Sequence, residues 1–248
     1  MATPHSRRRE EESYFVSMTD MMVGLLFVFI IMLMYFALQY KDSAEELLTA
    51  DATRADILEE LKESLKRDGV EVQIDTETGV LRLPDDVLFN RGEVNPKPAG
   101  VDALKKLARA LERIIPCYAV NPTPGAVRPA SCSPEAHSIE LLYVEGHTDS
   151  VNIYRPPIRD NWDLSTERAK ITRELLVAEA PVLADLTNTE PGNPAYARIL
   201  SYAGQADSRP VFGATSPDQN RRIDLRIIMA KPKPVSIERI ESGLGATQ

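Results

Sequence analysis

The sequence of 248 residues has only three histidines, His5, His137 and His147, and two cysteines, Cys117 and Cys132. Zinc sites usually take three or four closely spaced Cys or His ligands, and the chain has no CxxC pair. It also lacks a Ser-His-Asp series, a glycine-rich phosphate loop and a paired-carboxylate pattern. We therefore expect no catalytic site, no metal site and no bound cofactor, and we interpret His147 as a structural residue.

Basic side chains are fewer than acidic ones, 29 against 37, and the formal net charge is −8. No basic stripe runs along the chain, so a nucleic-acid partner is not expected. The one basic cluster, Arg7 to Arg9, precedes the most apolar segment, whereas Lys41 beyond that segment is followed at once by acidic residues. Because positive charge favours the cytoplasmic side, the N-terminus is predicted in the cytoplasm and everything after Tyr40 on the far side.

Long hydrophobic runs are absent apart from one, Met21 to Leu38. Counted from Ser17, the stretch has about 22 residues and would span roughly 33 Å as a helix, enough to cross a bilayer core. A cleaved signal peptide is the alternative. The run is longer than a usual signal core, however, and Phe36 to Gln39 is not a small-x-small cleavage site. The sequence thus predicts a single-pass membrane protein.

Asp20 stands at the head of this apolar run. A carboxylate inside a membrane helix costs about 2.5–3.5 kcal/mol on insertion scales, so such residues usually face protein or water and have a function. One interpretation makes Asp20 the group that binds and releases a transported ion. The other makes it a solvated residue at the interface that caps the N-terminus of the spanning helix.

The two cysteines lie on the exported side, where disulfides persist. Cys117 and Cys132 flank a segment rich in Pro, Gly, Ala and Ser, which has little apolar surface to order it. A disulfide would close a loop of about 16 residues and contribute about 3 kcal/mol in the chain-entropy model. We predict this disulfide; zinc bound by both cysteines and His137, or free thiols, are the alternatives.

Alternating and helical patterns predict the order ββαβαβ beyond the membrane segment. The expected strands are 70–74, 80–83, 138–145 and 221–229, the expected helices are 99–115 and 162–180, and 196–203 is a helix end or a strand. Residues 41–67 predict an amphipathic helix that packs on its own domain or pairs as a short coiled coil. The order predicts an α/β fold of the α+β kind, in which helices cover one face of a mixed sheet.

The predicted organisation has five parts. They are a cytoplasmic tail (1–14), a transmembrane helix (15–40), a linker helix (41–68), a folded domain (69–231) and a C-terminal tail (232–248). The part beyond the membrane helix is long enough for one medium domain with its own core.

Three motifs follow one another in the second half of the chain, namely Gly146-His-Thr-Asp149, Asn161-Trp-Asp-Leu-Ser-Thr-Glu-Arg-Ala169 and Asn220-Arg-Arg-Ile-Asp224. With Leu88-Phe-Asn-Arg-Gly92 upstream, they resemble the signature of the OmpA-like peptidoglycan-binding domain over about residues 70–230. The stem peptides of peptidoglycan carry a diamino acid with an ammonium and a carboxylate. A site for it needs an anion and a cation a few ångströms apart.

On this resemblance, the peptidoglycan-binding residues are Asp149, Asn161, Leu164, Arg168 and Arg222. Asp149 would take the ammonium, and Arg168 would take the carboxylate through its bidentate fork. Asn161 would add a hydrogen bond and Leu164 a packing surface. Arg222 would either touch the ligand or brace the fold. The alternative for Asp149 and Arg168 is a plain surface salt bridge.

A short tail, one span and Asp20 near its start are similar to MotB, the B-type stator subunit of the flagellar motor, as is the run from Asn161 to Ser165. Trp162 in that run is interpreted as core or pocket wall. The segment Ser17 to Met22 lacks MotB's aromatic pattern and looks closer to ZorB, the MotB-like subunit of Zorya anti-phage defence systems. The resemblance implies an inner-membrane protein with a periplasmic domain, built as a homodimer inside a pentamer of polytopic, MotA-like A-type subunits. It also implies transport of H⁺ or Na⁺ through Asp20, with H⁺ favoured.

Flagellar rotation, transport energisation and phage defence would all use these residues. A passive membrane-to-peptidoglycan tether would need no acidic residue in its span, so Asp20 counts against it. An enzyme acting on peptidoglycan would need a nucleophile or base constellation, which the sequence does not provide.

Overall fold

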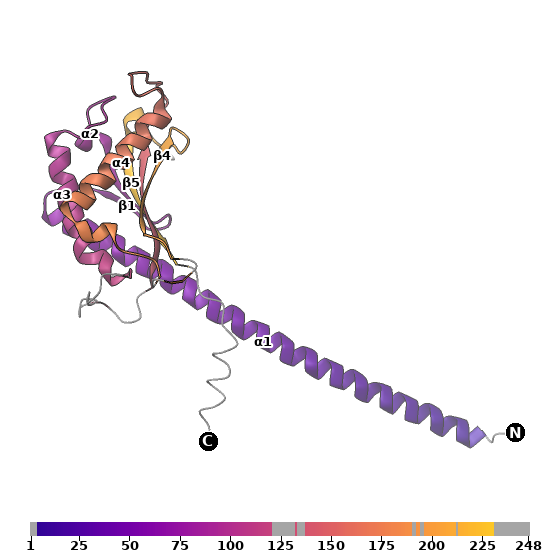
Figure 1. Ribbon diagram of the computed structural model, residues 1–248. Coiled ribbons are helices and arrows are strands. Elements are labelled where there is room, and N and C mark those ends of the chain that lie inside the picture. The colour runs from indigo at the N-terminus through magenta and orange to yellow at the C-terminus, as the bar shows by residue number, and fades with distance from the viewer. Residues whose placement is uncertain are drawn as a thin grey trace. The chain divides into compact units, whose positions relative to one another are not determined.

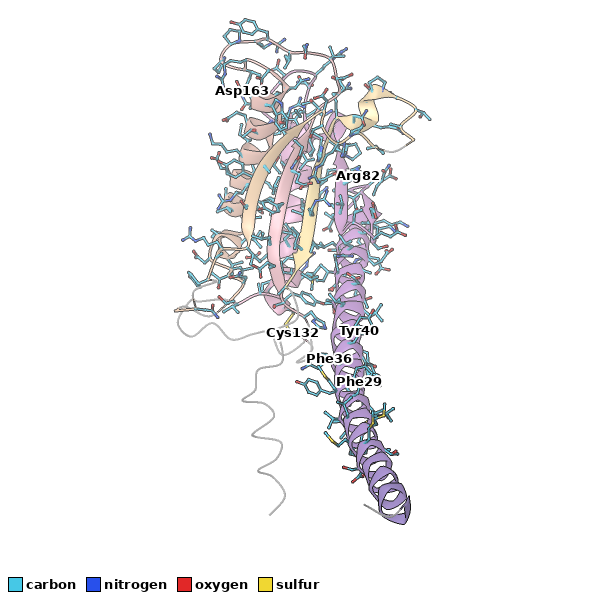
Figure 2. All side chains as sticks on the ribbon, turned by 90° about the vertical axis from the view of Figure 1, so that its right-hand side faces the viewer. Phe29, Phe36, Tyr40, Arg82, Cys132 and Asp163 are labelled. Carbon is cyan, nitrogen blue, oxygen red and sulfur yellow. A yellow bond between two sulfur atoms is a disulfide. The ribbon has the colours of Figure 1, made fainter. Side chains whose placement is uncertain are left out.

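A computed structural model of the chain describes residues 4–120, 132, 137–189, 192–193, 196–211 and 213–230. The chain divides into two compact units, Met1–Leu48 and Thr49–Gln248. Helix α1, Pro4–Arg67, forms the described part of the first unit and continues into the second. Within the described residues, Ser17–Lys41 is the one segment that could cross a membrane by length and composition, with a mean hydropathy of 2.7. Its apolar side chains are exposed, as Phe29 and Phe36 show in Figure 2.

Asp20 lies inside α1, well beyond the start of the helix at Pro4. The residues from Pro4 to position 14, expected as a cytoplasmic tail, belong to the same helix. An N-cap residue has a non-helical backbone and stands at the start of a helix. The structure therefore disagrees with the alternative in which Asp20 caps the spanning helix.

The second unit contains a five-stranded mixed sheet in the order β1-β2-β5-β3-β4. The strands are β1 Gln73–Asp75, β2 Val80–Pro84, β3 Ile139–His147, β4 Leu200–Ala206 and β5 Arg222–Met229. The helices are α2 Asp85–Leu88, α3 Pro98–Ile114 and α4 Asn161–Glu179, with short 3₁₀ turns at η1 Ile115–Cys117, η2 Pro181–Ala184 and η3 Pro217–Asn220. β3 and β4 are parallel, and the other neighbouring pairs are antiparallel. Helices α3 and α4 lie on one face of the sheet (Figure 1), which confirms the predicted fold class.

The core forms between that face and the helices. Successive side chains of a strand point to opposite faces, so alternate residues of β5, such as Leu225 and Ile227, are buried against the helices. Helix α3 meets them with an apolar stripe that includes Leu104, Leu107 and Leu111, each at most 1% exposed. The end of α1 belongs to the same core and contributes Ile57, Leu58, Leu61 and Leu65. Packing on its own domain is thus the alternative observed for this part of residues 41–67.

The end of α1 also explains why β1 begins later than expected. Gly69 has a φ of +75°, a left-handed conformation that favours glycine. The Val70 N–H donates to the Leu65 carbonyl at 2.9 Å, and the Gly69 N–H donates to the Lys66 carbonyl at 3.1 Å. These two bonds form the Schellman cap common at helix ends. The cap takes up the start of the predicted strand 70–74, and β1 begins at Gln73.

Cys117 and Cys132 form a disulfide with a Cα–Cα distance of 5.1 Å, which confirms the predicted pair. Both sulfur atoms are bonded to each other and cannot act as thiolate ligands, so the alternative of a zinc site made with His137 is wrong. His137 instead lies with its Nε2 3.0 Å from Thr49 Oγ1. Residues 121–131 within the disulfide loop and the predicted C-terminal tail, 232–248, lie outside the described residues.

The face of the sheet opposite to the helices carries a buried charge network. Arg226 binds the Glu145 carboxylate through Nε and Nη2 at 2.9–3.0 Å. Asp224 accepts from Arg222 Nε at 2.9 Å and from Arg82 Nε at 3.2 Å. Burial raises the pKa of Glu145, but the neighbouring His147 and Arg226 lower it by more, to about 2.

This pKa predicts an acid-sensitive contribution to stability. The folded pKa of Glu145 lies below its ordinary value of 4.5. The contribution is therefore complete above about pH 4.5 and is lost as the pH falls from there towards 2. We expect Glu145→Gln to lower the free energy of unfolding at neutral pH by at most about 3 kcal/mol and to flatten its pH dependence in that window.

Urea unfolding of the unit from Thr49 onward, measured between pH 2 and 7, tests this expectation. That unit contains the whole described core, so it can be studied without the membrane segment. Glu63→Gln is the matched control, because Glu63 is exposed. Equal pH profiles for wild type and Glu145→Gln would show that other carboxyl groups set the acid sensitivity.

Candidate functional site

The candidate site begins at the carboxyl end of β3. Asp149 follows this strand closely, and Gly146 near its end allows α4 to approach. A Cβ atom built on Gly146 would lie 2.1 Å from the Ser165 carbonyl oxygen, so only glycine fits this spacing. The Ser165 hydroxyl accepts the Ala206 N–H at 3.1 Å, which fastens α4 to the end of β4. The motif that contains Gly146 thus brings Asp149 next to the start of the helix.

Helix α4 presents three of the predicted residues on one side. Its N-cap is Asp160, whose carboxylate accepts the Asp163 N–H at 2.9 Å. Asn161, Leu164 and Arg168 follow at helical spacings of three and four residues and line the same cavity. The Asn161 amide donates to the Asp149 and Val151 carbonyls, both at 3.1 Å. Asn161 therefore fixes the loop that carries Asp149.

The Arg168 side chain is held on several sides and is 1% exposed. Its Nε donates to the Glu93 carbonyl at 2.8 Å, and Nη2 donates to the Asn90 carbonyl at 3.1 Å. The guanidinium carbon lies 4.7 Å from the centre of the Phe89 ring, in a cation–π arrangement. This places a full positive charge in the wall of the cavity with a fixed orientation.

Asp149 pairs with an arginine that the sequence analysis did not single out. Its Oδ1 accepts the Val151 N–H at 3.0 Å, and its Oδ2 accepts from Arg221 Nη1 at 2.8 Å. Arg221 Nη1 also lies 2.6 Å from Asp218 Oδ1. Burial lowers the pKa of Arg221, but the two carboxylates raise it by more. The carboxylate predicted to bind an ammonium thus already has one cationic neighbour.

These side chains surround a cavity of about 410 Å³, called the main cavity below. Its wall contains Arg91, Gly92, Thr148, Asp149, residues 151–155, Asn161, Leu164, Arg168 and Arg221. Arg155 forms an ion pair with Glu93, which ties the 151–155 loop to the loop before α3. Four arginines and a single carboxylate line the cavity, so a ligand with more negative than positive groups is favoured.

Arg222 and Trp162 lie elsewhere. Arg222 does not line the main cavity; its side chain donates to Asp224 and to the Asn220 and Arg209 carbonyls, and it is 4% exposed. Trp162 is 53% exposed and lines neither the core nor the main cavity, so its interpretation as core or pocket wall is wrong. The loop residues 151–155 and Arg221 were not identified from the sequence.

Glu145, His147 and Asp224 form a second titratable group, with possible metal-ligand atoms within 4.8 Å of one another. His147 is 1% exposed, and its Nε2 lies 3.5 Å from Asp224 and 3.7 Å from Glu145. Three arginines already hold the two carboxylates, so a divalent cation would have to displace guanidinium groups. The residues fit an ion-pair network better than a metal centre.

No protein-family model matches the sequence, and no curated protein sequence matches it. Among solved structures, the cell wall anchor of the T6SS from Pseudomonas aeruginosa is similar, at 19% identity over 70% of this chain and 97% of that chain, with a TM-score of 0.44. A MotB like protein from Desulfovibrio vulgaris is 19% identical over 71% of this chain and 96% of that one, with a TM-score of 0.45. A periplasmic domain of Helicobacter pylori MotB is 16% identical over 66% and 83%, with a TM-score of 0.41. These likenesses are too distant to assign any side chain of the site.

Proposed function

We propose that this chain is the B-type subunit of an ion-driven motor in the inner membrane, and that its second unit anchors the motor to peptidoglycan. The observation that carries the anchoring role is the main cavity, which both Asp149 and Arg168 line. The sequence motifs that resemble the OmpA-like domain supply these two residues. A carboxylate beside several guanidinium groups suits a ligand with one ammonium and one or more carboxylates.

In this proposal, the diamino acid of the wall's stem peptide binds in the main cavity. Its ammonium binds Asp149, where it shares or replaces the contact with Arg221, and its carboxylate binds Arg168. Asn161 keeps the Asp149 loop in place, and Leu164 provides an apolar contact. The role is binding without catalysis.

The motor role rests on Asp20 within the apolar segment Ser17–Lys41. Two copies of the chain would lie within a ring of MotA-like A-type subunits, proposed to be a pentamer, with Asp20 carrying H⁺, or Na⁺, at the interface. The N-terminus would lie in the cytoplasm and the second unit in the periplasm. By the likeness of Ser17 to Met22 to ZorB, we assign the motor to a Zorya-type anti-phage defence system rather than to a flagellum.

Competition in a sedimentation assay tests the anchoring role. The detergent-solubilised full-length protein should pellet with purified sacculi, and free meso-diaminopimelate should release it. Pimelate, which lacks the ammonium groups, and 1,5-diaminopentane, which lacks the carboxylates, should each be about ten- to a hundred-fold less effective, because each forfeits charge-assisted hydrogen bonds. Equal release by pimelate would show that the cavity does not recognise an ammonium. A protein that never pellets would contradict the anchoring role itself.

A further inference from the structure

A second cavity, called the arginine cavity below, has a volume of about 210 Å³ and lies where β2 meets the start of β5 and the turn before it. It is lined by three guanidinium groups, two amides and one carboxylate, those of Arg82, Arg221, Arg222, Gln73, Gln219 and Asp218. The role proposed for the main cavity does not use Arg82 or Arg222, which raises the question of what three arginines could bind here.

Positive charge is in excess in this cavity because two arginines share one carboxylate. Arg82 Nε donates to Asp224 Oδ1 at 3.2 Å, and Arg222 Nε donates to Oδ2 at 2.9 Å. Asp224 is 1% exposed. Burial and the charge of Arg82 together lower the pKa of Arg222 below its ordinary value, although Asp224 raises it. A cation would be repelled here, whereas an anion would relieve the repulsion between the two guanidinium groups.

Arg82, labelled in Figure 2, has the most exposed side chain of the three arginines, ahead of Arg221 at 17% and Arg222 at 5%. Its side chain is 22% exposed, and its one hydrogen bond to the described residues uses Nε. Both of its Nη groups therefore keep donors for a ligand. The planar fork of a guanidinium matches two oxygens of a carboxylate or of a phosphate.

Arg221 connects the two cavities, because its side chain lines both. A ligand that reaches from one cavity to the other would therefore pass along this side chain. In the stem peptide, the residue next to the diamino acid is a γ-linked D-glutamate, whose α-carboxylate is free unless it is amidated. This places a second anion one residue away from the group proposed for the main cavity.

We propose that the arginine cavity binds the α-carboxylate of this D-glutamate, so that the two cavities recognise neighbouring residues of one stem peptide. The proposal rests on the function proposed above. It makes Arg82 a specificity-determining residue, which distinguishes an acidic stem peptide from an amidated one.

Two synthetic tripeptides test this proposal, L-Ala-γ-D-Glu-meso-diaminopimelate and the same peptide with the D-glutamate α-carboxylate converted to an amide. Their affinities for the detergent-solubilised full-length protein are measured by calorimetry. Wild type should bind the acid about ten times more tightly than the amide, the effect of one hydrogen bond to a charged group. In Arg82→Gln this ratio should fall to about one. Arg198→Gln is the control, because it removes the same charge at a side chain that is 65% exposed and lines neither cavity.

The ratio of the two affinities distinguishes recognition of the D-glutamate α-carboxylate from a general loss of folding. Partial unfolding would weaken the binding of both peptides to the same extent. A ratio of about one in wild type, or an unchanged ratio in Arg82→Gln, would overturn the proposal while leaving the anchoring role intact. If the wild-type ratio is about one but inorganic phosphate binds in an Arg82-dependent manner, the cavity serves another anion, and the assignment to the stem peptide is wrong. If wild type binds neither tripeptide, both this proposal and the proposed function fail.

Discussion

Replacing Asp20 by Asn should abolish ion transport while the protein remains in the membrane at normal abundance. Asn has nearly the same size as Asp but cannot take up and release a proton. In the structure, Asp20 lies in the interior of α1, so a capping role cannot account for a carboxylate at this position. A residue that is costly in a membrane helix and has no capping role is a candidate for function.

Proton uptake measures the effect directly. Liposomes are prepared with the chain and its A-type partner and are loaded with a pH-sensitive dye. Under an imposed proton gradient, the lumen of liposomes with wild type should acidify, whereas the lumen pH should remain unchanged with Asp20→Asn. Asp56→Asn is the control, because Asp56 is an exposed carboxylate on the same helix outside the apolar segment. Repeating the assay with a sodium gradient distinguishes the two ions. Full transport by Asp20→Asn would exclude the ion-carrier role and favour a passive tether.

Arg168→Ala should release the protein from purified sacculi, with a loss of affinity of about ten- to a hundred-fold. The mutation removes the guanidinium that the Asn90 and Glu93 carbonyls orient towards the ligand. Asp149→Asn should weaken binding to a similar extent, because it removes the charge for the ammonium but keeps an oxygen for the Val151 N–H. Arg109→Ala is the control, since Arg109 is 58% exposed and pairs with Glu179 at the far end of α4.

The same variants decide whether Asp149 and Arg168 have only a structural role. In the structure, Asp149 is 6% exposed and Arg168 is 1% exposed, so they do not lie at the surface as the simple salt bridge considered from the sequence would require. Melting curves of each variant show whether it remains folded. If folded Arg168→Ala sediments with sacculi like wild type, Arg168 has no part in binding the wall, whatever the fold of the domain.

The strands and helices that build the core could be predicted because apolar residues recur along each of them with a clear strand or helix period. Helix α4 was expected at 162–180 and is observed at Asn161–Glu179, and the strand expected at 221–229 is observed at Arg222–Met229. The alternation in the last strand also distinguishes Arg221 from Arg222. A period of two places Arg222 with Asp224 and Arg226 on the polar face, whereas Arg221 precedes the strand on the side of Ile223 and the helices. Alternation alone would thus have chosen Arg221 over Arg222 as the arginine that lines the main cavity.

The rest of the main cavity depends on contacts between distant parts of the chain. Apolar residues do not recur at a regular spacing in residues 151–155. The position of this loop is set by the Asn161 amide and by the ion pair between Arg155 and Glu93. The exposure of Trp162 has a similar origin. It follows Asn161 directly, and residues one position apart in a helix do not share a face, so it points away from the cavity that Asn161, Leu164 and Arg168 line.

The close contact at Gly146 has a consequence for mutational screens of this domain. Helix α4 carries three residues of the cavity wall, and the distance between this helix and β3 therefore sets the width of the cavity. Even alanine at position 146 would clash with the Ser165 carbonyl, so α4 and β3 would have to move apart locally. Affinity can therefore be tuned, or lost, through a position that never touches the ligand. A library restricted to lining residues would miss a substitution that acts on all three helical contacts together.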